Sequence, residues 1–256
     1  MLLSAPSLKG SEDMDIKGRI HSVETMGTVD GPGIRYVIFM QGCPLRCIYC
    51  HNRDSWDPRG GREITVDELV EDINKYLVFI KGSGGGVTAT GGEPLMQPEF
   101  VRELFFRVRE MGLNTAVDTS GFIDIDRAKK LLEVTDLVLL SIKHVVEERH
   151  REITGVGTRK IISFLDYLRE IDKPLWIRYL IIPGYTDDPE DLNRLAMMLR
   201  DYNNIELVDI LPYHDMGAYK WEELGYDYPL KGVAVPTKQD MEKAKAVFRR
   251  YGLPMG

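Results

Sequence analysis

The stretch YVIFMQGCPLRCIYCHN (residues 36–52) joins an apolar run of strand length to every cysteine in the chain. The run YVIFM predicts a buried strand. Cys43, Cys47 and Cys50 follow it closely, and the other 253 of the 256 residues contain no cysteine. The loop after this strand therefore raises the question of which site needs three sulfurs and not four.

Apolar runs of strand length alternate with segments of helical periodicity from Gly18 onward. This alternation predicts an α/β fold with a mostly parallel sheet, in one domain over residues 18–256. Residues 1–17 are expected to form a flexible N-terminal extension. The predicted strands are Tyr36–Met40, Gly86–Thr90, Thr115–Asp118, Leu137–Ser141, Leu175–Ile181 and Glu206–Leu211. The predicted helices are Val66–Phe79, Pro98–Met111, Asp124–Val134, Arg159–Ile171 and Asp188–Tyr202.

Two of these helices carry start signals. Thr65 and Glu68 have the spacing of a capping box. Thr186 and Asp187 precede Pro189, which predicts a cap with proline in the first turn.

Composition excludes several classes of function. The formal net charge of −7 argues against a nucleic-acid partner, because such binding depends on clustered Lys and Arg. The apolar runs are far shorter than the roughly 20 residues of a membrane helix, so no membrane association is expected. We expect the chain in the cytoplasm, where an odd number of cysteines suits a metal site better than disulfides.

The C-x3-C-x2-C spacing lets three thiolates reach one metal centre from a single loop. Three unrelated buried thiols are one alternative. Another is a zinc site completed by His51, whose side chain would have to double back beside Cys50. A 4Fe-4S cluster held by three thiolates leaves one iron open to a substrate, which would explain the three sulfurs.

Other unusual polar groups follow the remaining predicted strands, and the carboxyl ends of parallel strands meet at one rim. Each has an ordinary alternative, namely a tight turn, a solvated lysine, a surface imidazole or a helix cap. Asp30, in the turn sequence TVDGPGIR, is expected on the same rim, facing the substrate. The strand-end groups are Gly91, Gly92, Glu93, Asp118, Thr119, Ser141, Lys143, Arg178 and His214.

With its cysteine spacing, with Tyr49 before the last cysteine and with the TGGEP motif, the chain resembles the radical S-adenosylmethionine superfamily. In that superfamily S-adenosylmethionine chelates the open iron of the cluster. One-electron reduction then yields methionine and a 5′-deoxyadenosyl radical. The resemblance implies cofactor contacts from Tyr49, Cys50, His51, Gly91, Gly92, Glu93, Ser141, Ile142, Lys143, Arg178 and His214.

Further motifs resemble one family within the superfamily, the activating enzymes of pyruvate formate-lyase. They cover about residues 18–252, and they are GRIHSVETMGTVDGPGIRYVIFMQGCPLRCIYCHNRDSWD, GGGVTATGGEPLMQPEF, DTSGF, ITGVG, WIRYLIIPGYTDD and ILPYH. The resemblance implies a partial, open (β/α)6 TIM-like barrel that abstracts a hydrogen atom from a glycine Cα of pyruvate formate-lyase, leaving a glycyl radical. It also implies flavodoxin or ferredoxin as the electron donor.

The sequence leaves two alternative functions open. Many activases of other glycyl-radical enzymes carry a cysteine-rich insert, for which this chain has no cysteines, but an activase of a different glycyl-radical enzyme stays an alternative. A zinc-binding structural or adaptor protein is the more distant one.

The chain departs from the family pattern after the fourth predicted strand. Where the family has Asp-x-Lys, this sequence has Ser141-Ile142-Lys143. The resemblance implies that the family's aspartate belongs to a monovalent-cation site. The other groups of that site match Asp118, Thr119 and the Leu139 main chain. Serine keeps an oxygen and loses the charge, so we expect weaker cation binding.

Overall fold

The computed structural model describes residues 16–256. Residues 1–15 of the expected flexible extension lie outside the described residues, whereas Ile16 packs against the main core and Lys17 begins a strand. Eight strands form one sheet in the order β3-β1-β2-β4-β5-β6-β7-β8. They are β1 (Lys17–Gly27), β2 (Arg35–Met40), β3 (Arg62–Thr65), β4 (Gly86–Gly91), β5 (Asn114–Thr119), β6 (Leu137–Ser141), β7 (Leu175–Ile181) and β8 (Ile205–Pro212).

The six strands from β2 to β8, omitting β3, are the six predicted ones, and all their pairings are parallel. The order runs from an edge at β3 to an edge at β8, so the sheet is an open, partial (β/α)6 barrel, as predicted. The prediction missed β1 and β3, which pair antiparallel on one side of β2. Both strands carry frequent charged or polar residues, so they lack a long apolar run.

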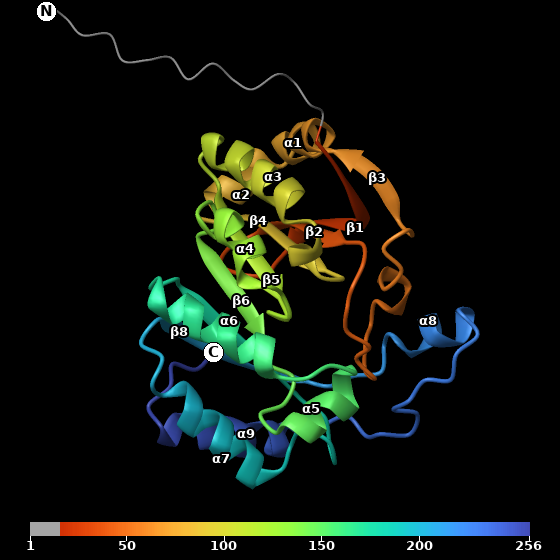
Figure 1. Cartoon of the computed structure of the whole chain (residues 1–256), viewed down its shortest axis with the longest axis vertical. Coiled ribbons are helices and arrows are strands. Elements are labelled where there is room, and N and C mark those ends of the chain that lie inside the picture. Colours follow the sequence, from red (N-terminus) through yellow and green to blue (C-terminus); the bar gives the residue numbers. More distant parts are fainter. Residues whose placement is uncertain (1–15) are drawn as a thin grey trace, which may run out of the picture.

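The described helices pack along the curved sheet, and α8 lies apart from the others at the right of Figure 1. Two short 3-10 turns, η1 (Arg53–Ser55) and η2 (Pro94–Met96), follow the cysteine loop and β4. The helices are α1 (Val66–Asn74), α2 (Leu77–Gly82), α3 (Pro98–Glu110), α4 (Ile125–Leu132), α5 (Glu147–Thr154), α6 (Arg159–Glu170), α7 (Pro189–Leu199), α8 (Ala218–Glu223) and α9 (Lys238–Arg250).

The first predicted helix is divided into α1 and α2. The amides of Lys75 and Tyr76 bond to carbonyls three residues back, which tightens the turn and ends α1. The prediction also missed α5, α8 and α9.

The capping box at the start of α1 is confirmed, with the Thr65 hydroxyl accepting from the Glu68 amide and the Glu68 carboxylate accepting from the Thr65 amide. The predicted cap of α7 is wrong by one position. Asp188 caps this helix, because its carboxylate accepts from the two amides that follow Pro189. The Thr186 hydroxyl instead bonds to the backbone at the end of β7.

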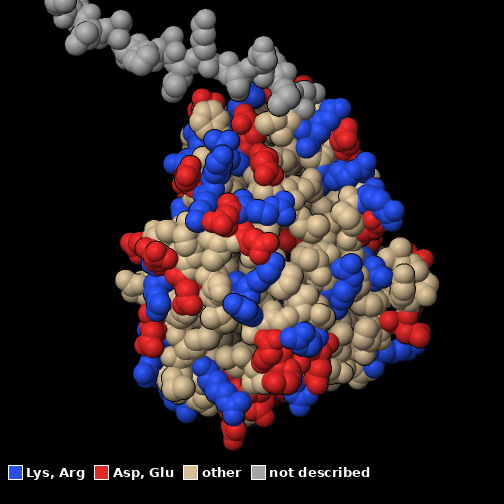
Figure 2. All heavy atoms as spheres, in the orientation of Figure 1, with Lys and Arg blue, Asp and Glu red and all other residues tan. Residues whose placement is uncertain are grey.

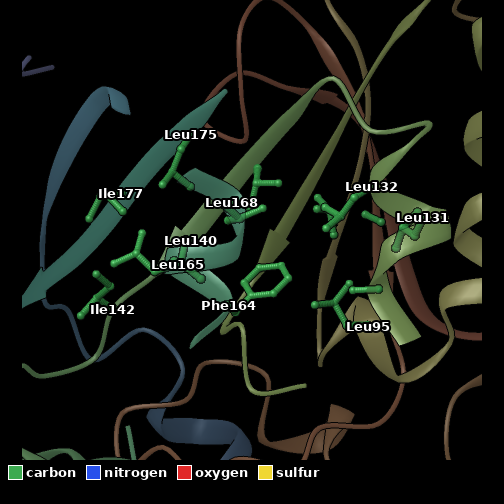
Figure 3. Packing of buried hydrophobic residues seen from close by; sticks show 14 of the residues in the cluster. Leu95, Leu131, Leu132, Leu140, Ile142, Phe164, Leu165, Leu168, Leu175 and Ile177 are labelled. Carbon is green, nitrogen blue, oxygen red and sulfur yellow. The ribbon is translucent and has the colours of Figure 1, made fainter. Parts of the chain in front are cut away.

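The main core lies between the sheet and the helices that cover it. Figure 3 shows Phe164, Leu165 and Leu168 of α6 packed against Leu140 and other strand residues. Burying each such side chain contributes about 2 kcal/mol. This packing fixes where the carboxyl ends of the parallel strands lie.

The face drawn in Figure 2 carries Lys and Arg interspersed with Asp and Glu. Within residues 16–256, no helix is both long and apolar enough to cross a membrane.

Candidate functional site

A cavity of about 500 Å³ opens at the carboxyl ends of the parallel strands. The cysteine loop after β2 and the ends of β4, β5, β6, β7 and β8 all contribute to its lining. In-register pairing explains this convergence, because Met40 lies beside Gly91, and Ser141 lies beside Arg178. The predicted rim is therefore where the site forms.

Cys43, Cys47 and Cys50 line this cavity together, and each is half-buried. Backbone bonds hold their loop in place from the α5 side, where the amides of Arg46 and Ile48 donate to carbonyls at the end of α5, at 2.7 and 3.0 Å. The loop is therefore a supported part of the fold.

Burial raises the pKa of all three thiols, that of Cys47 to about 12. Neutral thiols are expected here unless a cation replaces their protons, which bound iron does. In the part of the chain that the structure describes, no three His, Cys, Asp or Glu side chains converge on a single-ion site. Three thiols in one cavity lining, with no fourth cysteine in the chain, fit a cluster that leaves one iron open better than a structural zinc site, which takes four protein ligands.

The turn after β4 is joined to the start of the cysteine loop. The Gly92 amide donates to the Met40 carbonyl at 2.9 Å, and the Glu93 amide donates to the Gly42 carbonyl at 2.8 Å. A Cβ on Gly91 would lie 2.7 Å from the Met40 nitrogen, and one on Gly92 would lie 2.3 Å from the Gly42 oxygen. Only glycine permits this approach.

Gly91 and Gly92 line the cavity, whereas the Glu93 carboxylate lies behind them and is 1% exposed. It accepts the Thr119 hydroxyl at 2.6 Å, the Ser120 amide and hydroxyl at 2.9 and 2.5 Å, and the Leu95 amide at 3.1 Å. Burial raises the pKa of Glu93, and these bonds oppose that shift. Its side chain therefore holds the glycine turn against the end of β5.

A charged cluster forms a neighbouring part of the lining, since the Thr90 hydroxyl next to Gly91 donates to Asp118. The Nη1 atom of Arg178 lies 2.7 Å from Oδ2 of Asp118 and 3.7 Å from Oδ1 of Asp30. Burial lowers the pKa of Arg178, but the carboxylates of Asp118, Asp30 and Asp209 outweigh it and leave that pKa raised. Burial also raises the pKa of Asp30, although Arg178 opposes this. The guanidinium is thus held in place by two carboxylates while it lines the cavity.

Asp30 lines the same cavity as the strand-end groups, but its loop does not follow a strand at the carboxyl rim. Its loop joins β1 to β2 at the amino end of β2, since Gly27 pairs with Arg35. The loop then packs against β4, where the Asp30 carbonyl accepts a hydrogen bond from the Thr88 hydroxyl at 2.8 Å. Asp30 therefore reaches the cavity from the opposite end of the strands.

Lys143 and Tyr49 meet beside the cysteines, with the Lys143 Nζ 5.6 Å from the Tyr49 ring centroid. On the other side, His51 stacks on His214 with ring centroids 4.1 Å apart, and the His51 Nε2 bonds to the His214 carbonyl at 2.9 Å. Burial lowers the pKa of His51, which favours a neutral ring. All four side chains line the cavity. Because the His51 Nε2 bonds to the His214 carbonyl, this nitrogen has a partner other than a metal.

Some buried polar atoms of this lining have no hydrogen-bond partner among the described residues: the Tyr49 hydroxyl, Nε of Arg178 and Nδ1 of His214. Buried polar groups are normally paired, so such atoms suit a polar ligand in the cavity.

Comparisons with known proteins identify the family. The model of the radical SAM superfamily matches residues 37–196. The chain belongs to the radical SAM superfamily. It is also 46% identical to the pyruvate formate-lyase 1-activating enzyme of Escherichia coli K12 over 93% of this chain and 98% of the relative. It is 45% identical to the pyruvate formate-lyase-activating enzyme of Listeria monocytogenes over 91% of this chain and 97% of the relative.

A solved structure gives the same indication. A domain of the pyruvate-formate lyase-activating enzyme from Bacteroides vulgatus aligns with a TM-score of 0.58 and 25% identity, over 67% of this chain and 98% of that one. The chain is therefore a member of the pyruvate formate-lyase-activating family within the radical SAM superfamily, as the sequence motifs indicated.

Asp118 and Thr119, which match the family's cation site, already have hydrogen-bond partners in this radical SAM chain. Asp118 accepts from Arg178 and, at 3.0 Å, from the Thr90 hydroxyl. Thr119 donates to Glu93. The Leu139 side chain lies on the same face of the sheet as Asp118, its register partner, and packs with Ala116, Leu137 and Trp176. Ser141 lines the cavity without adding a charge.

Ile142 both lines the cavity and belongs to the main core, at 2% exposed (Figure 3). Sequence reasoning missed Trp56, which also lines the cavity and donates its indole N–H to the Cys50 sulfur at 3.2 Å. A tryptophan in the polar stretch six residues after the last cysteine was the available signal.

Proposed function

We propose that this protein activates pyruvate formate-lyase. In this reaction S-adenosylmethionine is reductively cleaved at a 4Fe-4S cluster, and the 5′-deoxyadenosyl radical removes a hydrogen atom from a glycine Cα of the partner enzyme. The observation that carries the proposal is the placement of three cysteines on one cavity wall together with two cationic side chains, Lys143 and Arg178.

Cys43, Cys47 and Cys50 would hold the cluster, because they line the same cavity and the chain has no fourth cysteine. The cluster supplies one electron and an iron open to the amino and carboxylate groups of S-adenosylmethionine. The chain's own residues bind and orient that substrate.

We assign the methionine end of S-adenosylmethionine to the region between the glycine turn and the two cations. Gly91 and Gly92 let a ligand approach the backbone, and Arg178 and Lys143 suit a carboxylate. The aromatic and imidazole groups Tyr49, His51 and His214 suit the adenosine end, next to Ser141 and Ile142. We assign Glu93 to supporting the turn, because its oxygens are already occupied.

Asp30 is proposed to act on the protein substrate, since it lies in the cavity and is held 3.7 Å from Arg178. The open sheet suits a macromolecular substrate, whose glycine must be admitted to a cavity of limited size. We further propose that residues 18–256 act as one domain in the cytoplasm, with flavodoxin or ferredoxin as the electron donor and at most weak monovalent-cation binding near Ser141.

The decisive experiment is anaerobic reconstitution with iron and sulfide, followed by mixing with pyruvate formate-lyase, S-adenosylmethionine and a reductant. Electron paramagnetic resonance should detect a glycyl radical on pyruvate formate-lyase. Replacing Cys43, Cys47 or Cys50 by alanine should abolish both the radical and the cleavage of S-adenosylmethionine.

Two results would contradict the proposal. A colourless protein that contains zinc after anaerobic purification would indicate the structural or adaptor alternative. A cluster-containing protein that forms a radical only on a different glycyl-radical enzyme would assign the chain another partner.

A further inference from the structure

Trp56 contacts the cysteine loop at both of its ends. Its indole Nε1 donates to the Cys50 sulfur at 3.2 Å, and its backbone carbonyl accepts from the Cys43 amide at 3.3 Å. One residue thereby joins the first and the last cysteine of the cluster motif. The N–H points at a sulfur that faces the cavity.

The packing around Trp56 fixes the direction of this N–H. The ring is 7% exposed, with the Arg53 guanidinium 4.0 Å and the Arg46 guanidinium 5.0 Å from its centroid. Trp221 meets it edge-on, at 5.4 Å and an interplanar angle of 85°. The donor is therefore oriented by its neighbours and does not depend on the sulfur alone.

We propose that Trp56 is a positioning residue that raises the reduction potential of the cluster through its N–H···S bond to Cys50. The inference rests on the proposed function, because it requires a cluster on these cysteines. Adding one electron to the cluster increases the negative charge on its sulfur ligands. A hydrogen-bond donor stabilises that charge more in the reduced state than in the oxidised state, so reduction becomes easier.

Trp221 provides a matched control within the same aromatic cluster. Its ring is similarly buried, at 6% exposed, and its indole Nε1 donates to the Cys50 carbonyl at 2.9 Å. It thus touches the same cysteine through the backbone and leaves the sulfur alone. Phenylalanine at either position removes one N–H and keeps an aromatic ring, so the two variants differ mainly in whether a sulfur loses its donor.

The experiment compares wild type, Trp56→Phe and Trp221→Phe after reconstitution to the same iron and sulfide content. A redox titration is followed by the electron paramagnetic resonance signal of the reduced cluster. The midpoint of Trp56→Phe should move to a more negative potential, so that the ratio of reduced to oxidised cluster at the wild-type midpoint falls about threefold or more. The midpoint of Trp221→Phe should stay close to that of wild type.

Equal midpoints for Trp56→Phe and wild type would overturn the inference, as would equal shifts in the two variants, which indicate a general packing effect. A wild-type protein that assembles no cluster would instead overturn the proposed function, and the inference with it. The two failures are thus distinguishable without measuring activity.

A second measurement applies even if Trp56→Phe does not retain a cluster. The Trp221→Phe protein is labelled with ¹⁵N in its tryptophan indoles, which leaves Trp56 and Trp176 as the labelled positions. Trp176 packs with Leu139 in a separate cluster of the core. Electron-nuclear double resonance of the reduced cluster should show a ¹⁵N coupling, and its absence would overturn the N–H···S bond.

Discussion

Two walls of the cavity satisfy their charged groups in different ways. The glycine wall consists of Gly91 to Glu93 with Thr119 and Ser120, and four donors saturate its one carboxylate. The charged wall consists of Asp30, Asp118, Lys143 and Arg178, and it leaves Nε of Arg178 buried without a partner among the described residues.

The difference indicates separate roles: the glycine wall maintains the shape of the cavity, and the charged wall binds the ligand. A buried carboxylate with all its bonds made holds backbone in place and has nothing left for a ligand. A guanidinium held by carboxylates on one side, with an unpaired N–H, is positioned in advance for a further acceptor. Changes in the glycine wall should therefore act on stability first, and changes in the charged wall should act on binding first.

Replacing Glu93 by glutamine should produce the largest loss of stability. Glutamine keeps only one of the two oxygens that accept from the Leu95 amide, the Thr119 hydroxyl and the amide and hydroxyl of Ser120, so buried donors lose their acceptor. We expect the free energy of unfolding to fall by about 3 kcal/mol, measured by urea denaturation. Glu99→Gln, at an exposed position of α3, is the control and should change it by less than about 0.5 kcal/mol. Similar losses in both variants would refute the role given to Glu93.

Replacing Arg178 by lysine should affect ligand binding more than stability. Lysine keeps the charge beside Asp118 and Asp30 and loses the planar guanidinium with its Nε donor. The affinity for S-adenosylmethionine, measured by calorimetry on the reconstituted protein, should fall about tenfold, which corresponds to about 1.4 kcal/mol. The free energy of unfolding should change by less than about 1 kcal/mol. A large loss of stability with unchanged affinity would reverse the comparison of the two walls.

Replacing Ser141 by aspartate should add a cation requirement to the charged wall. Ser141 lies beside Arg178 in register, so the new carboxylate would join those of Asp118 and Asp30 near a single guanidinium. We expect the activity of the wild type to depend weakly on potassium and that of Ser141→Asp to depend on it more steeply, because a carboxylate strengthens cation binding. Potassium titrations at constant ionic strength test this, and equally steep curves would contradict it.

Glu147 tests how burial affects a hydrogen-bonded carboxylate, because it accepts from donors like those of Glu93 but lies at the surface. It accepts from the Thr158 amide and hydroxyl and from Arg151. The Thr158 hydroxyl, with the other donors, lowers the pKa of Glu147 from 4.5 to about 2, whereas burial raises that of Glu93. The same kind of bonding is thus accompanied by opposite shifts, and burial decides which.

The sign of the pH dependence follows from the lowered pKa of Glu147. Its contribution to stability is complete above pH 4.5 and is lost progressively as the pH falls toward about 2. The difference in urea midpoint between wild type and Glu147→Gln should therefore be smaller at pH 3 than at pH 7. A difference that stays the same or grows at pH 3 would contradict the assignment. We expect this effect to be the smallest of the four.

Local sequence predicted the parallel strands well, because each contains a compact apolar run, and β2, β4 and β6 are buried almost throughout. It missed β1, in which polar residues alternate with buried ones, and its partner β3. It also predicted the wrong cap for α7. Asp187 and Asp188 are both competent caps, and Asp187 is engaged by the Gly184 amide.

The sequence by itself determined the number and spacing of the cysteines, the succession of the six parallel strands along the chain and the rim on which the strand-end polar residues gather, because these depend on local periodicity and on the rule for parallel strands. Only the tertiary structure decided which polar groups meet. It brought Asp30 into the cavity from the amino end of β2, engaged Asp118 with Arg178 and directed the Trp56 N–H at the Cys50 sulfur. Those contacts join residues up to 148 positions apart, Asp30 and Arg178, and only packing can bring such residues together.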